Sequence, residues 1–506
     1  MSHQQTEKNR EFQPSSDGRS HAVVIGGSLA GLLTARMLAE HFDRVTVVER
    51  DRFPVGPLPR KGVPQSRHIH VLMKRGRLIL EEFFPGLQDE MIAAGAPVLD
   101  MAGDAAWLTP AGWGLRFPSD LTMLACTRDF LDWNVRRRLA DFAGVTFLQQ
   151  VEVTRLLPNA EGSGVAGVAI QFRDSAGEDD PHQCLLHADV VVDASGRGSR
   201  APQWLASLGY APPAETVIDG FLGYASRLYQ PLAGFKADWK CLYIQAAPPN
   251  RTRAGLLFPV EGDRWLVTLS GGGRDYPPTD EAGFVEFARS LASPLLYDAI
   301  KDAAPLSPIH SYRATENRLR HYERLSRWPE NLMVLGDAAC AFNPVYGQGM
   351  TIAALGVKKL DEILRMRNEA SRTDGRLTDV GLVGAGLTGI ARRFQQEMAK
   401  VNTAPWLLAT GEDFRYRETV GGSPTLATRL MHRYMDQVIR LSTENREVRR
   451  QFMEIFHMMK PPSAMFHPLV LRRVAGQPWR LMTWPKGTIS PTQTVAGAGR
   501  TAIGNT

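Results

Sequence analysis

The stretch from residue 21 to residue 50 constrains this chain more than any other. The apolar run HAVVIGG ends in two glycines, LAGLLTARMLAEH follows with helical periodicity, and the β-branched run RVTVVE ends at Glu49. A buried strand, a glycine turn, a helix and a second strand form the βαβ unit that holds a diphosphate at a helix N-terminus. The sequence therefore predicts an α/β fold built around a dinucleotide site.

The turn departs from G-x-G-x-x-G at one position, where Ser28 replaces the middle glycine. Gly26 permits the tight turn, and Gly31 lets the helix pack closely on the strand. Glu49 lies where a partner for a ribose hydroxyl is expected, and its charge disfavours a 2′-phosphate. We therefore expect FAD or NAD to be held by the residues of this turn and the strand end after it: Gly26, Gly27, Ser28, Leu29, Ala30, Gly31, Glu49 and Arg50.

Composition excludes several classes of protein. The 506 residues carry a formal charge of +6, with no basic stripe interleaved with aromatic residues, so we expect no nucleic-acid partner. The four cysteines form no CxxC pair, which excludes a zinc or disulfide framework and favours a reducing compartment. The polar N-terminus and the lack of a long apolar run predict no signal peptide and no transmembrane segment, hence a cytoplasmic protein.

Two motifs near residue 340 distinguish a flavin from a nicotinamide cofactor. Gly336 and Asp337 follow the apolar run NLMVL, and Asp337 could accept hydrogen bonds from ribityl hydroxyls. Gly347 and Gly349 leave backbone N–H groups bare where a helical pattern begins. The positive end of that helix would stabilise negative charge on a reduced flavin. The sequence therefore favours FAD.

The pattern of strands and helices predicts the domain organisation. Strand-like runs at 145–157, 165–172, 185–193 and 331–335 are expected to join the first two strands in one sheet whose carboxyl ends face the ligand. Strand-like runs between 212 and 308, with a hairpin turn at Glu261-Gly262-Asp263, predict an antiparallel second sheet. The expected units are a disordered arm (1–20), a discontinuous FAD-binding domain (21–80, 126–211 and 309–370), a substrate domain (81–125 and 212–308), a helical C-terminal region (371–485) and a flexible tail (486–506).

The order of these motifs resembles the FAD-dependent aromatic hydroxylases and epoxidases with the p-hydroxybenzoate hydroxylase fold, from about residue 21 to residue 370. The resemblance implies that Arg128 contacts the diphosphate–ribose region, that Asp193 lies near the flavin, and that Asp337 binds the ribityl chain. It also implies that the isoalloxazine is lined by Pro344, Gly347, Gln348, Gly349 and Met350. Ala194 and Ser195 stand where an Asp-Gly pair is usual, so NADPH recognition is not carried over to this segment.

Within that superfamily, the loop RKGVPQSRHIH (60–70) and the string NPVYGQGMT (343–351) look like bacterial epoxidases of polyether biosynthesis, which are distantly similar to squalene epoxidase. Arg60, Gln65 and His68 are candidates to lie near the flavin. A spacing of two puts His68 and His70 on one side of the chain, but no third ligand suggests a metal site, and we expect them at a helix start packed near the flavin. The W-x-W-x-I-P string of halogenases is absent.

The resemblance implies a monooxygenase that transfers one oxygen atom from O2, through a flavin C4a-hydroperoxide, to a hydrophobic substrate. Alkene epoxidation of a polyketide or terpenoid is the first expectation and hydroxylation the second. No catalytic side chain is required, because the flavin carries the chemistry. Aromatic side chains from the second sheet would form the roof over the substrate: Phe221, Tyr224, Trp239, Tyr243, Phe258 and Trp265.

Two other readings stay open at this point. One is a flavin-dependent reductase or dehydrogenase of an isoprenoid-like substrate, and the other is a non-catalytic FAD-binding protein. NAD(P)H is the expected electron source, and a separate flavin reductase could deliver the electrons because no second dinucleotide fold is visible. The apolar segment 458–484 could cap the pocket or touch a membrane peripherally, but packing in the core is the simpler expectation.

Overall fold

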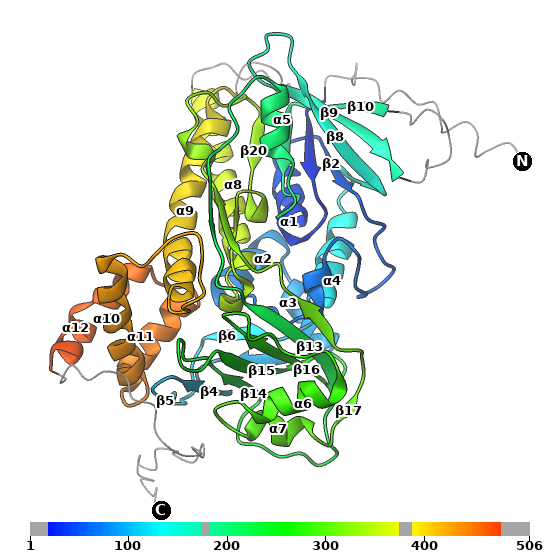
Figure 1. Ribbon diagram of the computed structural model, residues 1–506. Helices are drawn as coiled ribbons and strands as arrows, with labels where there is room; N and C mark the ends of the chain where they lie inside the picture. Colours follow the sequence, from blue (N-terminus) through cyan, green and yellow to red (C-terminus); the bar gives the residue numbers. More distant parts are fainter. Residues whose placement is uncertain (1–18, 174–182, 374–386, 477–506) are drawn as a thin grey trace, which may run out of the picture.

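The computed structural model describes residues 19–173, 183–373 and 387–476 (Figure 1). The predicted arm and tail therefore lie, apart from Arg19 and Ser20, outside the described residues. Of the helices within the described part, none is long and apolar enough to span a membrane.

A five-stranded parallel sheet forms the centre of the part of the chain that carries the glycine turn. Its order is β20-β11-β1-β2-β7, and every neighbouring pair is parallel. The strands are β1 (His21–Ile25), β2 (Arg44–Glu49), β7 (Val145–Gln149), β11 (Val190–Asp193) and β20 (Leu332–Val334). Every residue of β1 is buried, which explains its unbroken apolar run. The predicted βαβ unit and α/β fold, an arrangement known as Rossmann-like, are confirmed, with the carboxyl ends of β1, β11 and β20 side by side.

The run 165–172 lies wholly outside this sheet, and the run 145–157 is divided because only β7 belongs to the sheet, so that part of the prediction was wrong. β8 (Val151–Pro158), β9 (Val165–Phe172) and β10 (Gln183–His187) form a separate antiparallel sheet. The predicted strand 185–193 is divided, because its first half pairs with β9 and only its second half, β11, enters the parallel sheet. β8 alternates buried and exposed residues, a pattern typical of antiparallel strands with one solvated face.

An eight-stranded sheet, which we call the roof sheet, forms the second domain (Figure 1). Its strands are β4 (Ala105–Thr109), β5 (Gly112–Trp113), β13 (Gly223–Gln230), β14 (Cys241–Ile244), β15 (Arg253–Val260), β16 (Arg264–Gly271), β17 (Ala304–Pro305) and β18 (His310–Tyr312). The pairings are antiparallel except between β14 and β4. The predicted hairpin joins β15 to β16, with Gly262 and Asp263 both at positive φ (74° and 51°).

Helices fill the remaining volume around the two sheets. Those on the side of the parallel sheet are α1 (Leu29–Leu38), α2 (Lys74–Phe83), α3 (Leu87–Ala93), α4 (Arg128–Ala140), α5 (Ala201–Ser207) and α8 (Gly349–Thr373). The helices α6 (Glu281–Arg289) and α7 (Leu295–Ile300) cover one face of the roof sheet (Figure 1). The short strands form two small sheets, one of β3 (Val98–Asp100) and β6 (Thr122–Leu124), the other of β12 (Glu215–Ile218), β19 (Asn317–Arg320) and β21 (Cys340–Ala341).

The C-terminal region is helical, and it packs against both domains. It comprises α9 (Ile390–Asp413), α10 (Leu426–Ser442), α11 (Arg446–Phe456) and α12 (Pro468–Ala475). α9 runs along α8, as Figure 1 shows. From α11, Phe452 and Phe456 place their rings 5.8 and 5.4 Å from Trp107 of β4. Within the described part of segment 458–484, Met465, Val470 and Val474 pack against α10 and α11, so this part serves as core.

Candidate functional site

A cavity of about 490 Å³ runs from the glycine turn after β1 to the loop before α8. We call its two parts the nucleotide end (Gly26–Ala30, Glu49, Arg50 and Arg128) and the flavin end (Gly336, Asp337 and the loop 342–350, of which all residues but Tyr346 and Gln348 line the cavity). Between them, the roof sheet contributes Tyr224, Leu256, Thr268 and Tyr312. The two sequence motifs some 300 residues apart therefore border one cavity, as their assignment to a single cofactor requires.

The glycines of the first turn are required by close backbone contacts. Gly26 has φ +102°, and a Cβ atom there would lie 2.7 Å from the carbonyl oxygen of Ala194. At Gly31 a Cβ would lie only 1.8 Å from the carbonyl oxygen of Gly26, although Gly31 itself does not line the cavity. The strand, turn and helix are thus packed with no room for side chains, which brings the N-terminus of α1 to the cavity wall.

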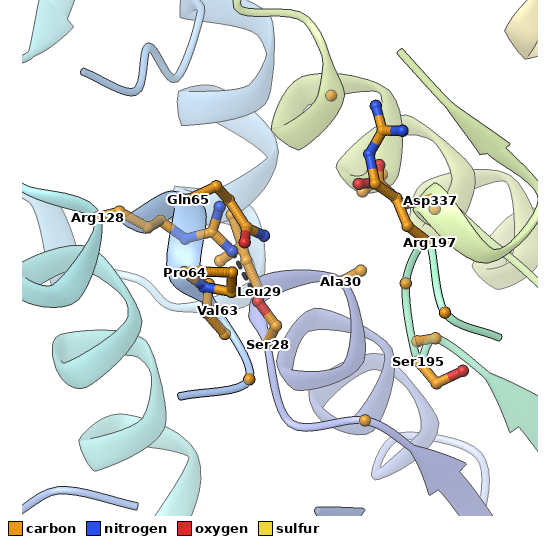
Figure 2. Close-up of a pocket in the computed structure, with 18 of the residues that line it drawn as sticks. Ser28, Leu29, Ala30, Val63, Pro64, Gln65, Arg128, Ser195, Arg197 and Asp337 are labelled. Carbon is orange, nitrogen blue, oxygen red and sulfur yellow. Dashed lines mark hydrogen bonds between the residues drawn. The ribbon is translucent and has the colours of Figure 1, made fainter. Parts of the chain in front are cut away.

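Ser28, the departure from the glycine pattern, holds an arginine in place. Arg128 Nη2 donates to Ser28 Oγ at 2.8 Å (Figure 2). Arg128 Nε donates to Asp132 Oδ1 at 2.7 Å. Arg128 is the first residue of α4, whose N-cap Thr127 accepts a hydrogen bond from Phe130 N. The guanidinium is fixed above the N-terminus of α1, where both positive groups would face a diphosphate.

Glu49 stabilises the turn as well as lining the cavity. Glu49 Oε2 accepts from Gly27 N at 2.7 Å and pairs with Arg60 Nη1 at 2.8 Å. Arg60 Nη2 in turn donates to the carbonyl oxygen of Gly27 at 2.9 Å. Arg60 therefore belongs to the nucleotide end, where it offsets the charge of Glu49. Carboxylate oxygens accept more than one hydrogen bond each, so Glu49 keeps capacity for a ribose hydroxyl.

Asp337 lies at the flavin end with its carboxylate uncommitted. It borders the cavity and accepts no hydrogen bond from any residue that the structure describes. Burial raises its pKa, whereas the positive charges of Arg197 and Arg128 act in the opposite direction. A buried acceptor without a donor is costly unless a ligand satisfies it.

The loop before α8 leaves backbone groups open to the cavity. Pro344, Gly347, Gly349 and Met350 line it, and Gln348 does not. Gly347 has φ +63°, and a Cβ at Gly349 would meet only Asp337 Oδ1, at 3.9 Å. Gly349 is also the first residue of α8, a helix of 25 residues, so the positive end of the helix faces the cavity.

Asp193 does not line the cavity; it supports the loop that does. Its carboxylate accepts from Ser195 N and Ser195 Oγ at 2.9 and 2.6 Å and from Ser199 Oγ at 2.5 Å. Burial raises the pKa of Asp193 even so. The same loop carries Arg197. Its Nη1 donates to the carbonyl oxygen of Glu316 and its Nη2 to that of Phe342, both at 2.8 Å. The sequence singled out this segment but not Arg197, which fastens it to the flavin end.

The loop before α2 departs from expectation. Gln65, at the start of the same loop, lines the cavity beside Arg128 (Figure 2). His68 and His70 do not begin a helix, because a short 3₁₀ helix (Pro64–Arg67) precedes them and α2 begins at Lys74. They also do not share surroundings. His68 contacts the roof sheet through Ser226, and His70 is influenced by the charge of Arg128. Contacts with distant residues hold this segment in an extended conformation, and the local sequence pattern does not reveal such contacts.

Only one of the six aromatic residues expected in the pocket roof lines the cavity, namely Tyr224. Trp239 and Trp265 belong to the core between the roof sheet and α6–α7. Tyr243 and Phe258 pack in the cluster around Trp107. The two faces of an antiparallel sheet alternate along each strand, and the sequence alone did not tell which face meets the cavity.

Taken together, these residues fit FAD. The nucleotide end offers a helix N-terminus and Arg128 for a diphosphate, with Glu49 for a ribose. The flavin end offers the uncommitted acceptor Asp337 for polyol hydroxyls and the open backbone of Gly347 and Gly349 for a planar ring. The donors and acceptors are distributed as an adenine dinucleotide with a flavin requires.

Comparison with known proteins agrees with this geometry. Residues 19–374 match the sequence family described as FAD binding domain. Protein Rv3254 of Mycobacterium tuberculosis is 35% identical over 362 residues, covering 70% of this chain and 75% of that protein. Kynurenine 3-monooxygenase of Xanthomonas axonopodis pv. citri is 26% identical over 351 residues, 65% of this chain and 69% of that enzyme. The solved structure of PqsL from Pseudomonas aeruginosa shares the fold, with a TM-score of 0.56 at 19% identity over 79% of this chain and 98% of its own.

Proposed function

This chain belongs to the FAD binding domain family, and from that premise we propose that it is an FAD-dependent monooxygenase acting on a hydrophobic small molecule. The observation that carries the proposal is the continuity of the cavity. The flavin end, with Asp337 and Gly349, opens directly onto the roof residues Tyr224 and Tyr312. A substrate held there would lie against the reactive ring of the cofactor.

In this proposal, the chain's own residues bind and orient the cofactor and shield the reacting atoms from water. Arg128 and the N-terminus of α1 hold the diphosphate, Glu49 holds a ribose, and Asp337 holds the ribityl chain. The positive end of α8 stabilises negative charge on the ring. Bound FAD, once reduced, supplies the activation of O2 and the transfer of one oxygen atom. The apolar residues Leu256 and Val71 keep water from the reacting atoms.

Several features favour oxygen transfer over the alternatives. The relative from Xanthomonas is named a monooxygenase. The continuation of the cavity from the flavin end to the roof residues Tyr224 and Tyr312 is unneeded in a protein that only binds FAD. The motifs at 60–70 and 343–351 support epoxidation of an alkene in a polyketide or terpenoid, with hydroxylation of an activated ring as the second candidate. NAD(P)H is the proposed electron source, and a separate flavin reductase would deliver the electrons.

The test begins with FAD-loaded protein in an anaerobic stopped-flow instrument. Flavin reduction by NADPH and by NADH is followed with and without a polyene or phenolic probe, and free reduced flavin replaces the nucleotides in a parallel series. Mixing with O2 should then yield a product heavier by one oxygen atom, labelled when ¹⁸O2 is used. A product formed without O2 uptake would identify a reductase. Reoxidation that leaves every probe unchanged would support the non-catalytic reading.

A further inference from the structure

His68 occupies a position in the cavity wall that the cofactor does not explain. It is 6% exposed, lines the cavity, and lies against the roof sheet. Its ring centroid is 6.0 Å from that of Tyr224 and 5.7 Å from that of Tyr312. Tyr224 Oη donates to Asn343 Oδ1 at 3.0 Å, and Asn343 begins the loop of the flavin end. His68 therefore lies where roof and flavin end meet.

A short chain of hydrogen bonds links His68 Nδ1 to two hydroxyl groups of the roof sheet. Ser226 Oγ lies 2.7 Å from His68 Nδ1 and 2.6 Å from Thr268 Oγ1, and Thr268 Oγ1 also accepts from Ile69 N at 3.2 Å. If Thr268 donates to Ser226 and Ser226 donates to His68 Nδ1, both hydroxyl protons are used. The reverse order would place the proton on Nδ1 and leave the Thr268 hydroxyl, rather than His68 Nε2–H, as the donor without an acceptor. The first arrangement makes Nδ1 an acceptor and places the proton on Nε2.

The Nε2 atom of His68 is buried and has no hydrogen-bond partner among the residues that the structure describes. Burial lowers the pKa of His68 to about 3, with the neighbouring His70, His310 and Arg67 acting in the same direction, so the ring is neutral at physiological pH. An unsatisfied N–H donor in an apolar wall costs free energy that an acceptor from a ligand would recover.

His70, two residues away, has the opposite tautomer. Its Nδ1 lies 2.9 Å from the carbonyl oxygen of His68, which can only accept, so His70 carries its proton on Nδ1 and Nε2 is an acceptor. Burial and the charge of Arg128 lower the pKa of His70 to about 4. His70 belongs with the polyhydroxylated cofactor, whereas His68 belongs with the roof.

We propose that His68 Nε2–H is the recognition point for an uncharged acceptor oxygen, a carbonyl or a phenol oxygen, on an otherwise hydrophobic substrate. This inference rests on the proposed function and specifies the substrate class of the same site. A neutral donor suits a neutral oxygen, because a buried carboxylate would need a charged partner. Arg197, which lines the cavity and contacts Phe342 of the flavin end, already donates from both Nη atoms to backbone carbonyls.

The test uses FAD-loaded protein and two uncharged bicyclic probes that differ by one carbonyl oxygen, 1-tetralone and tetralin. Equilibrium dialysis should show the ketone binding about tenfold tighter than the hydrocarbon. His68→Leu should remove the preference. His68→Gln should retain most of it, because the glutamine amide can accept from Ser226 and donate to the ketone. His187→Gln, a change at an exposed histidine of β10, is the matched control and should behave as the native protein.

A second readout does not depend on any variant. In ¹⁵N-imidazole spectra, His68 should show the Nε2–H tautomer, and its Nε2 resonance should shift when 1-tetralone is added. Equal affinity for the two probes, failure of both to bind, or a preference that survives in His68→Leu would overturn the inference. The binding test needs no turnover. Selective ketone binding without O2 uptake would therefore contradict the proposed function alone, and oxygenation without the His68-dependent preference would contradict this inference alone.

Discussion

The side-chain amide of Asn343 donates to both carboxylate oxygens of Asp413, at 3.1 and 3.4 Å, and so joins the flavin end to the last residue of α9. Asn317 Nδ2 donates to Asp413 Oδ2 at 2.6 Å, and both Asp413 and Asn343 are at most 1% exposed. The family match ends at residue 374, so a residue beyond it supports the loop that lines the cavity.

We expect Asp413→Asn to weaken both the fold and FAD binding. An asparagine has one acceptor oxygen for the two amides of Asn317 and Asn343, and its own NH2 would face a donor. The free energy of unfolding should fall by about 1–3 kcal/mol, measured by urea denaturation, and FAD affinity should fall in a fluorescence titration. Glu397→Gln, which removes a surface pair with Lys400 on the same helix, is the control and should be nearly neutral. Equal effects of the two substitutions would refute this role for Asp413.

The same carboxylate should make stability depend on pH. Burial raises the pKa of Asp413 from its usual value near 3.8 to about 7, although hydrogen bonds from Asn343 and Asn317 oppose the shift. The folded state then binds more protons than the unfolded state between about pH 4 and pH 7, so the contribution of Asp413 is largest at low pH and is lost as pH rises through 7. The difference in unfolding free energy between the native protein and Asp413→Asn should change by up to about 1.4 kcal/mol per pH unit in that range. Parallel curves from pH 5 to pH 8 would show that Asp413 does not titrate there.

Arg128→Lys should lower FAD affinity by about tenfold or more while the fold is retained. Lysine keeps the charge but cannot bond Ser28 and Asp132 and still face a diphosphate, because it lacks the planar fork. Titration of apoprotein with FAD gives the affinity. Arg137→Ala removes an arginine of the same helix whose partner is the exposed Glu90, and it should leave FAD binding unchanged. An unaltered dissociation constant in Arg128→Lys would place the diphosphate elsewhere.

Gly31→Ala should destabilise the protein by about 1–3 kcal/mol and abolish tight FAD binding, because its Cβ would overlap the carbonyl oxygen of Gly26. Gly198 offers a matched comparison. It lines the cavity, but a Cβ there would meet no atom within 4 Å, so Gly198→Ala should be tolerated. Thermal unfolding and bound-flavin absorbance measure both variants. Similar stability of the two proteins would mean that the close packing of α1 on β1 is not needed.

The sequence alone predicted the features that depend on residues close together along the chain. The strand, turn and helix from residue 21, the hairpin at residues 261–263 and the helix after Gly349 all follow from local periodicity and glycine placement, and the structure has each of them. Glu49, Arg128, Asp337 and Gly349 were chosen because they follow strands or begin helices, and these positions gather at one edge of a parallel sheet. All four line the cavity.

The relationships between segments that are distant in the sequence were decided only by the tertiary structure. Which sheet β8 and β9 join, which face of the roof sheet meets the cavity, and which aromatic residue reaches it depend on strand pairing and register. The bonds of His68 to Ser226 and of Asn343 to Asp413 join residues 158 and 70 positions apart. A single side chain does not reveal its partner across such distances, because hydrogen bonding and burial are satisfied by whatever the fold brings near. The sequence by itself determined the cofactor that this fold would hold, and the packing of the fold decided how the cavity is supported and what it presents to a substrate.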